Sequence, residues 1–224
     1  DIMRLSDLDR IERNGATITI GAGVRQAALL EWPELRDSLQ LVALALPWTG
    51  HVQTRSRGTV CGSIAHADPS AELPLVLLAS GGEIHLRSRR KARRVPAERF
   101  FTGLMSTART DDEMVEAVSL PAPPAGAGHA FREIGRRHGD YAIVACAAVV
   151  PRDGEARLAV GGVADRPVVR ALPAPDAPDL DDALDALAWD LEARDDLHAT
   201  ARYRRELVRR LGRATIEEAA RCRA

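Results

Sequence analysis

A run of proline, alanine and glycine at positions 121–128 divides this sequence into two parts. Proline has no N–H group to donate and glycine leaves the backbone flexible, so clusters of the two are typical of linkers. The chain has 224 residues, which is enough for one large domain or two small ones. We therefore predict two folded units, residues 1–122 and residues 129–224.

The first unit combines helices with short strands. Residues 16–20 alternate apolar and polar side chains, which is typical of a half-buried strand. Residues 47–67 lose this regularity and predict an ordered loop with irregular helical turns. We expect helices at residues 24–31, 34–46 and 71–80, the last one buried with Pro74 in its first turn. We expect a short antiparallel sheet from strands at residues 83–88, 91–95 and 113–120.

The second unit places its strands first and its helices after them. We expect a three-stranded antiparallel sheet from residues 130–136, 142–150 and 156–163. We expect helices at residues 180–192, 198–211 and 215–222, with Asp179 or Asp181 and Thr215 as N-caps. Leu184, Leu187 and Leu191 recur on one helical face, as core or as a subunit contact. The predicted fold class is α+β for the whole chain.

Composition excludes several classes of protein. Apolar residues make up 46% and charged residues 28%, as in ordinary globular proteins, and the net charge of -1 gives no overall attraction to nucleic acid. No stretch is long enough for a membrane span, and the first residues have no signal-peptide layout. The three cysteines form no C-x-x-C pair, so we expect reduced thiols and a cytoplasmic protein.

Catalytic and metal-binding patterns are absent from the sequence. The six histidines have no H-x-x-x-H or H-E-x-x-H spacing, so we predict no metal site. The sequence also lacks a G-x-S-x-G element, so we do not predict a serine hydrolase. Gly21-Ala22-Gly23 is followed by Gln26 where a dinucleotide fingerprint needs glycine, which excludes a Rossmann site. The basic run at residues 87–94 predicts a solvated hairpin turn that could also meet an acidic partner surface.

Residues 55–74 are the most informative part of the sequence. The small residues Gly58, Gly62 and Ser63 let backbone N–H groups approach a phosphate, and the hydroxyls of Thr59 and Ser63 add donors. Asp68 and Glu72 are four residues apart and can accept hydrogen bonds from sugar hydroxyls. A capped loop without a ligand explains the same residues equally well.

This run resembles the second FAD-binding segment of the medium, flavin-carrying subunit of molybdenum hydroxylases of the carbon monoxide dehydrogenase and xanthine dehydrogenase type. The family pattern is R-N-R-G-T-x-G-G-S-x-A-H-A-D-P-x-x-E-L-P, and this chain departs from it at Ser56 and Cys61. Three further motifs follow in order: F-F-x-G at residues 100–103, R-R-x-G-D-[FYW]-A at 136–142, and D-x-H-x-[ST]-A-x-Y-R-R at 196–205.

The resemblance implies a role for individual residues. Gly58, Thr59, Gly62 and Ser63 would lie at the FAD pyrophosphate or the adjoining sugar, and Asp68 and Glu72 would hold ribose or ribityl hydroxyls. Tyr141 would lie near the isoalloxazine ring, where an aromatic side chain can cover one face. Arg132 is a further candidate for the flavin edge. The residues alone, without the family, predict instead that Tyr141 is a core aromatic at the start of a strand.

The resemblance also implies partners and an activity. A large subunit would carry the molybdenum cofactor and a small subunit two [2Fe-2S] centres, in a dimer of heterotrimers. Electrons would pass from the iron–sulfur centres through FAD to an acceptor, with no hydroxylation and no catalytic residue in this subunit. The fold expected from the family is a second FAD-binding subdomain followed by a small C-terminal domain.

Two alternatives stay open at this stage. Family members carry an A-G-G-x-S loop ahead of the equivalent of Asp1, and this sequence does not contain that loop. The chain could therefore be an interaction module that keeps the fold and binds no flavin. It could also be a fragment, or one part of a split subunit whose first FAD subdomain is supplied by another polypeptide.

Overall fold

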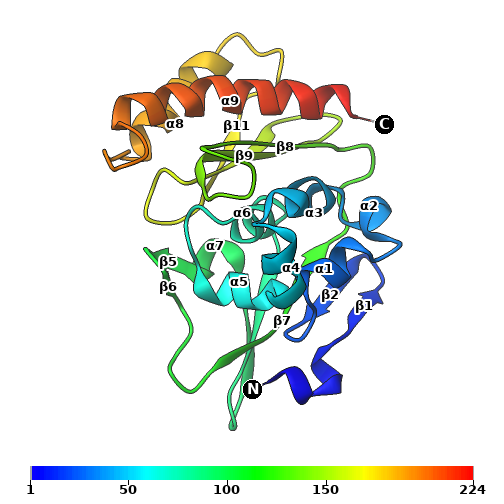
Figure 1. The fold of residues 1–224 in the computed structure, drawn as a ribbon. Helices are drawn as coiled ribbons and strands as arrows, with labels where there is room; N and C mark the ends of the chain where they lie inside the picture. Colours follow the sequence, from blue (N-terminus) through cyan, green and yellow to red (C-terminus); the bar gives the residue numbers. More distant parts are fainter. Residues whose placement is uncertain (1, 224) are drawn as a thin grey trace.

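Two antiparallel sheets, one layer of helices between them and two helices above form the molecule (Figure 1). The computed structural model describes residues 2–223. The α-helices are α1 (Gln26–Leu30), α2 (Leu35–Ser38), α3 (Gln40–Ala45), α4 (Val52–Arg57), α5 (Val60–His66), α6 (Glu72–Ala79), α7 (Ala97–Phe100), α8 (Leu180–Asp190) and α9 (Ala201–Arg221). Short 3-10 turns are η1 (Ile2–Arg4), η2 (Ser6–Leu8) and η3 (Leu46–Trp48). No helix among residues 2–223 is both long enough and apolar enough to span a membrane.

The first sheet has the strand order β1-β2-β7-β3-β4. Its strands are β1 (Ile11–Asn14), β2 (Thr17–Gly21), β3 (Glu83–Arg87), β4 (Ala92–Pro96) and β7 (Met114–Pro121). The four strands that the sequence predicts are therefore confirmed, but they belong to one larger sheet. The additional strand β1 is an edge strand whose side chains are mostly exposed, so it carries no alternating pattern. A separate hairpin consists of β5 (Phe101–Gly103) and β6 (Ser106–Thr107).

Helical structure in the first unit differs from the prediction in two places. The expected helix at residues 34–46 is interrupted at Leu39, whose φ of -137° is not helical and whose side chain is buried. The expected loop at residues 47–67 contains two regular helices, α4 and α5, separated by Gly58 and Thr59. Thr59 caps α5 because its side chain accepts a hydrogen bond from the Gly62 N–H group.

The second sheet has four strands, so the prediction of three was wrong. The order is β11-β10-β9-β8, from β8 (Gly128–Gly135), β9 (Ala142–Val150), β10 (Ala156–Gly161) and β11 (Val168–Leu172). The missed strand β11 lies at the edge, and Arg170 and Ala171 are exposed. An edge strand with little buried surface gives almost no periodic signal.

The two C-terminal helices expected from the sequence are a single helix, α9. Gly212 lies inside this helix and does not end it. A Cβ at this position would lie 3.0 Å from Leu184 and 3.2 Å from Leu158, so glycine is explained by the close packing that it allows. Thr215 is not an N-cap, since its hydroxyl donates to the Leu211 carbonyl oxygen. Thr200 caps the helix by accepting from the Tyr203 N–H group.

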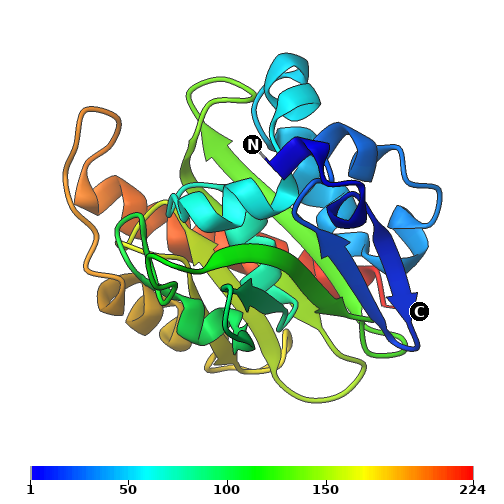
Figure 2. The same ribbon diagram turned by 90° about the horizontal axis from the view of Figure 1, so that it is seen from below.

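Both faces of the second sheet are covered, so the sheet lies between two apolar cores, and one of these cores is shared with the first unit. Helices α8 and α9 lie on one face, and α3 and α6 on the other. All nine residues of β9 and all eight of α6 are consequently buried. Leu184, Leu187 and Leu191 are buried against α9, which identifies them as core. Figure 2 shows β1 and β2 on the side of the molecule opposite the turn that precedes α9.

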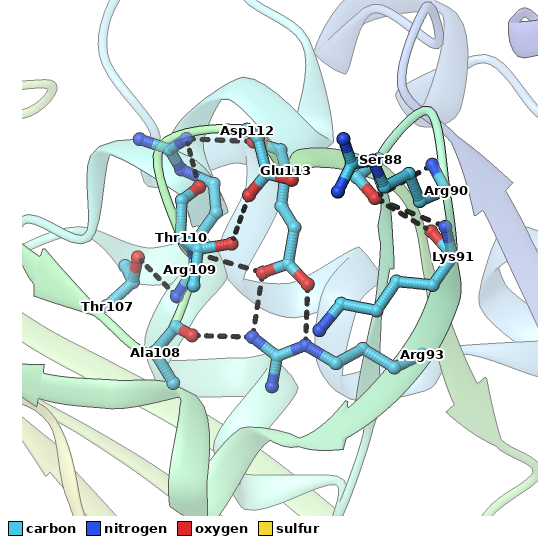
Figure 3. A network of polar contacts seen from close by, with 10 residues as sticks. All are labelled: Ser88, Arg90, Lys91, Arg93, Thr107, Ala108, Arg109, Thr110, Asp112 and Glu113. Atoms are coloured by element: carbon cyan, nitrogen blue, oxygen red, sulfur yellow. Dashed lines mark hydrogen bonds and ion pairs between the residues drawn. The ribbon is translucent and has the colours of Figure 1, made fainter.

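The predicted basic turn at residues 88–91 joins β3 to β4, and a polar network fixes the strand behind it (Figure 3). The Arg93 guanidinium donates to both carboxylate oxygens of Glu113, at 2.6 and 2.7 Å, and to the Ala108 carbonyl oxygen. The Arg93 hydrogen bond, aided by the Thr110 N–H group, lowers the pKa of Glu113 to about 2. The network therefore ties the loop at residues 108–113 to the hairpin.

We expect Glu113→Gln to loosen this loop, because a neutral amide offers Arg93 one acceptor oxygen in place of two. Hydrogen-exchange measurements should show faster exchange of the Thr110 amide. In the wild type this N–H group donates to Glu113 Oε2 at 3.0 Å. Glu116→Gln is the matched control, since Glu116 on the central strand β7 pairs with Arg87 on β3 and its side chain does not hold the loop. Unchanged protection of Thr110 in Glu113→Gln would contradict this account.

Candidate functional site

A pocket of about 390 Å³ lies where α1, α4, α5 and α6 meet the loop that leads into β9. Most of the residues singled out in the sequence line it: Gly58, Thr59, Gly62, Ser63, Glu72 and Tyr141. The lining also contains eight residues that were not among the predicted site residues: Gln26, Thr49, Gly50, Thr54, His66, Ala71, Gly139 and Asp140. The pocket thus combines segments that are far apart in the chain.

The turn from Gly58 to Ser63 forms one wall of the pocket and caps α5 at the same time. The Gly62 N–H group donates to Thr59 Oγ1 at 3.0 Å, so it is already satisfied within the protein. A Cβ at Gly62 would lie 2.8 Å from the same oxygen, which explains why glycine is needed there. The Thr59 hydroxyl keeps its own hydrogen for another acceptor, and Ser63 adds a second hydroxyl.

Gln26 and Thr49 bring unpaired polar atoms to this wall. Gln26 holds the turn through its N–H group, which donates to the Gly58 carbonyl oxygen at 2.9 Å, and through Nε2, which donates to the Thr59 carbonyl oxygen at 3.4 Å. Gln26 Oε1 and Thr49 Oγ1 are buried and meet no partner with hydrogen-bond geometry, while the Thr49 side chain lies close enough to Glu72 to lower the pKa of that carboxyl group. Buried polar atoms are normally paired, so these two indicate a missing polar ligand.

Glu72 is the buried carboxylate of the pocket. Its residue is only 3% exposed, and burial raises its pKa, helped by the nearby charge of Asp68. The Arg55 guanidinium opposes this shift from a fixed position, since it donates to the carbonyl oxygens of Thr49 and Gly50 at 3.0 and 2.8 Å. Glu72 is therefore an acceptor in a confined site with one cation nearby.

Asp68 lies in the turn between α5 and α6 and is not part of the pocket lining. Its Oδ1 accepts a hydrogen bond from the Ser70 N–H group at 2.8 Å, which shapes the turn between α5 and α6. Ala67 at the end of α5 has a φ of 55°, so this turn is tightly constrained. Asp68 is close enough to raise the pKa of both Glu72 and Tyr141.

Tyr141 lies at the rim of the pocket and is 60% exposed. The alternative that it is a core aromatic is therefore wrong. Gly139 brings its loop to the rim, because at a φ of 89° a Cβ there would lie 2.7 Å from the His51 ring. Glycine thus allows this loop to contact the segment at residues 50–51 and to complete one side of the pocket.

Arg132 is, with Asp68, one of the two predicted site residues that the structure does not bring to the pocket lining. Side chains alternate along β8, and Arg132 points toward α9, where its Nε donates to Glu218 Oε2 at 2.7 Å. Its neighbours Phe131 and Glu133 consequently lie on the opposite face, toward the first unit. The sequence signal for Glu133 was available, because it lies three residues before the R-R-x-G-D motif.

Comparison with known proteins now identifies the family. Residues 1–123 match the family described as FAD binding domain in molybdopterin dehydrogenase, and residues 129–219 match CO dehydrogenase flavoprotein C-terminal domain. The chain is 35% identical over 234 residues to the nicotine 6-hydroxylase medium subunit of Paenarthrobacter nicotinovorans, covering 98% of this chain and 81% of that protein. It is 30% identical to the carbon monoxide dehydrogenase medium chain of Afipia carboxidovorans, with 98% and 80% covered.

Solved structures agree with this result. A chain of carbon monoxide dehydrogenase from Hydrogenophaga pseudoflava superimposes with a TM-score of 0.90 at 28% identity, covering 99% of this chain and 81% of that one. The chain belongs to the FAD-binding medium subunits of molybdenum-dependent dehydrogenases. The predicted family, fold class and cofactor are thereby confirmed.

Proposed function

We propose that the pocket holds part of FAD and that this chain passes electrons from the [2Fe-2S] centres of a small subunit to an acceptor. A large subunit with the molybdenum cofactor would complete the complex, in keeping with relatives that are named as medium subunits. The observation that carries the proposal is the pocket itself, because the motif residues converge on it and leave buried oxygens unpaired.

The polar groups of the pocket fit a dinucleotide. The hydroxyls of Thr59 and Ser63 can donate to phosphate oxygens, and Gly58 and Gly62 keep side chains away from that wall. Glu72, Gln26 Oε1 and Thr49 Oγ1 can accept from ribose or ribityl hydroxyls, which would satisfy the two unpaired atoms. Tyr141 at the rim is placed to cover an aromatic ring. Asp68 would act through the turn that positions Glu72, and the direction of Arg132 does not favour a role for it.

When bound, FAD supplies the oxidation–reduction chemistry. The residues of the chain bind and orient it: Arg55 fixes the loop at Thr49 and Gly50, and Gln26 fixes the turn at Gly58. No group of three or more His, Cys, Asp or Glu side chains within residues 2–223 is arranged to hold a metal. In the proposed electron transfer, the metal centres belong to partner subunits.

We expect Glu72→Ala to weaken FAD binding by about 10- to 100-fold, because a hydrogen bond to a charged acceptor is worth about 1.5–3 kcal/mol. Titration of the chain with FAD, followed by flavin fluorescence, measures this. Glu31→Ala is the control, since Glu31 is exposed and outside the pocket. If the wild-type chain retains no flavin at any pH, the proposal fails and the interaction module becomes the better interpretation.

A further inference from the structure

One buried carboxyl group next to the pocket has no role in the function proposed above. Glu133 is 7% exposed, and its Oε2 is buried without a hydrogen-bond partner. It forms no ion pair with any residue in the range 2–223. Burying a charged carboxylate without a partner is very unfavourable, so such a group holds a proton instead.

The position of Glu133 on β8 directs its side chain toward the first unit, which carries the flavin pocket. It pairs with Ala145 in the sheet and shares a face with Phe131, which packs into the core of the first unit. Arg132 and Ala130 lie on the other face, the former bound to α9 and the latter in the second core. Alternation along the strand thus separates Glu133 from every group that contacts Arg132.

Glu72 on the pocket wall is the acidic group whose charge acts on Glu133. Burial, reinforced by the charge of Glu72, raises the pKa of Glu133 to about 8. Two buried carboxyl groups that sense each other do not both ionise readily, so one keeps its proton at neutral pH. Glu72 has Arg55 nearby and lies on the pocket lining, and both features favour its ionised form; Glu133 has neither feature. The proton therefore stays on Glu133.

The other charged or titratable groups around the pair do not supply a positive charge to Glu133. Asp68 in the turn between α5 and α6 and Tyr141 at the start of β9 add only negative charge when ionised. The charge of the Arg55 guanidinium on α4 acts on Glu72 and not on Glu133. His138 lies against the Trp48 ring with 4.9 Å between ring centroids.

We propose that Glu133 is a positioning residue for the flavin pocket: as a neutral acid it leaves Glu72 as the single negative acceptor for a cofactor hydroxyl. This inference rests on the proposed FAD function and deepens it. Ionisation of Glu133 would add a second negative charge beside Glu72 and near an anionic dinucleotide, and both effects oppose binding. FAD affinity should therefore fall when the proton leaves.

The test is the pH dependence of FAD binding between pH 6.5 and 9. For wild type we expect the affinity to fall above about pH 8, approaching tenfold per pH unit, because release of one proton is linked to binding. Glu133→Gln, a neutral side chain of the same shape, should bind as wild type does at pH 7 and show no such fall. Glu155→Gln, at an exposed position, should keep the wild-type profile.

Each outcome has a defined meaning. If the wild type binds FAD and Glu133→Gln shows the same fall with pH, the role of Glu133 is overturned while the proposed function stands. If the wild type binds no FAD, the proposed function fails first. Should Glu133→Gln not fold, carboxyl ¹³C shifts of the glutamate-labelled wild type decide: a glutamate titrating near pH 8 supports the proposal, and titration of every glutamate below pH 6 overturns it.

Discussion

Arg204→Ala is expected to lower the free energy of unfolding by about 3 kcal/mol, because it removes a buried cation together with all of its hydrogen bonds. Arg204 is 6% exposed and donates to the carbonyl oxygens of Ile143 and Gly162 and to the Asp196 carboxylate. Without the guanidinium, two buried carbonyl oxygens lose a partner. Urea denaturation followed by circular dichroism measures the change.

Arg202 provides the matched control for this prediction. It lies on the same helix, α9, but its side chain is exposed, so Arg202→Ala should change the free energy of unfolding by less than about 0.5 kcal/mol. A loss below about 1 kcal/mol in Arg204→Ala would show that the buried hydrogen bonds contribute little. Arg204→Lys should recover only part of the stability, because a lysine cannot span three acceptors with one planar group.

The contacts of Arg204 explain a motif that lies outside the pocket. In the D-x-H-x-[ST]-A-x-Y-R-R motif, Asp196 accepts hydrogen bonds from the N–H groups of His198 and Ala199 and from Arg204. Arg204 in turn holds Gly162, whose N–H group donates to the Pro69 carbonyl oxygen at 2.8 Å. Pro69 follows Asp68 directly. The motif therefore supports the turn between α5 and α6 from behind, and Arg204→Ala should weaken FAD binding as well as stability.

Elements with a strong pattern could be predicted from the sequence, and two of the edge strands could not. The apolar run of α6 and the continuous apolar strand β9 were predicted because burial on all sides leaves a clear signal. The edge strands β1 and β11 were missed because most of their side chains face solvent or are small. The continuity of α9 was missed because Gly212 looks like a helix end until its close contact with Leu184 is known.

The same distinction holds for the site. Gly58, Thr59 and Ser63 belong to one motif, so their presence at the pocket followed from local sequence. Gln26 and Thr49 come from other segments, and their importance depends on buried oxygens that only the folded chain reveals. Long-range packing, which places α1 beside α4, is what a single sequence does not contain.

Glu133→Gln is expected to change how the stability of the chain depends on pH. The folded-state pKa of about 8 is above the ordinary value of 4.5, so the folded chain binds more protons than the unfolded chain between these values. The contribution of Glu133 to stability is fully present below about pH 4.5 and is lost as pH rises toward 8. The loss amounts to at most about 1.4 kcal/mol per pH unit.

Urea denaturation of both proteins without cofactor at pH 5, 7 and 9 measures this difference. The free energy of unfolding of Glu133→Gln should exceed that of wild type by an amount that grows from pH 5 to pH 9. Buried groups that do not interact with Glu133, such as His129, titrate in both proteins and cancel in the comparison. Parallel curves for the two proteins would mean that Glu133 does not hold its proton.

This measurement separates two properties of Glu133 that FAD binding alone would combine. A buried proton affects stability whether or not a ligand binds, whereas positioning of Glu72 is visible only when FAD is present. If stability depends on pH as expected but FAD affinity does not, Glu133 is a buried acid without influence on the pocket. If both depend on pH and both dependences disappear in Glu133→Gln, the proton on this one β8 side chain affects both the stability of the chain and the flavin site.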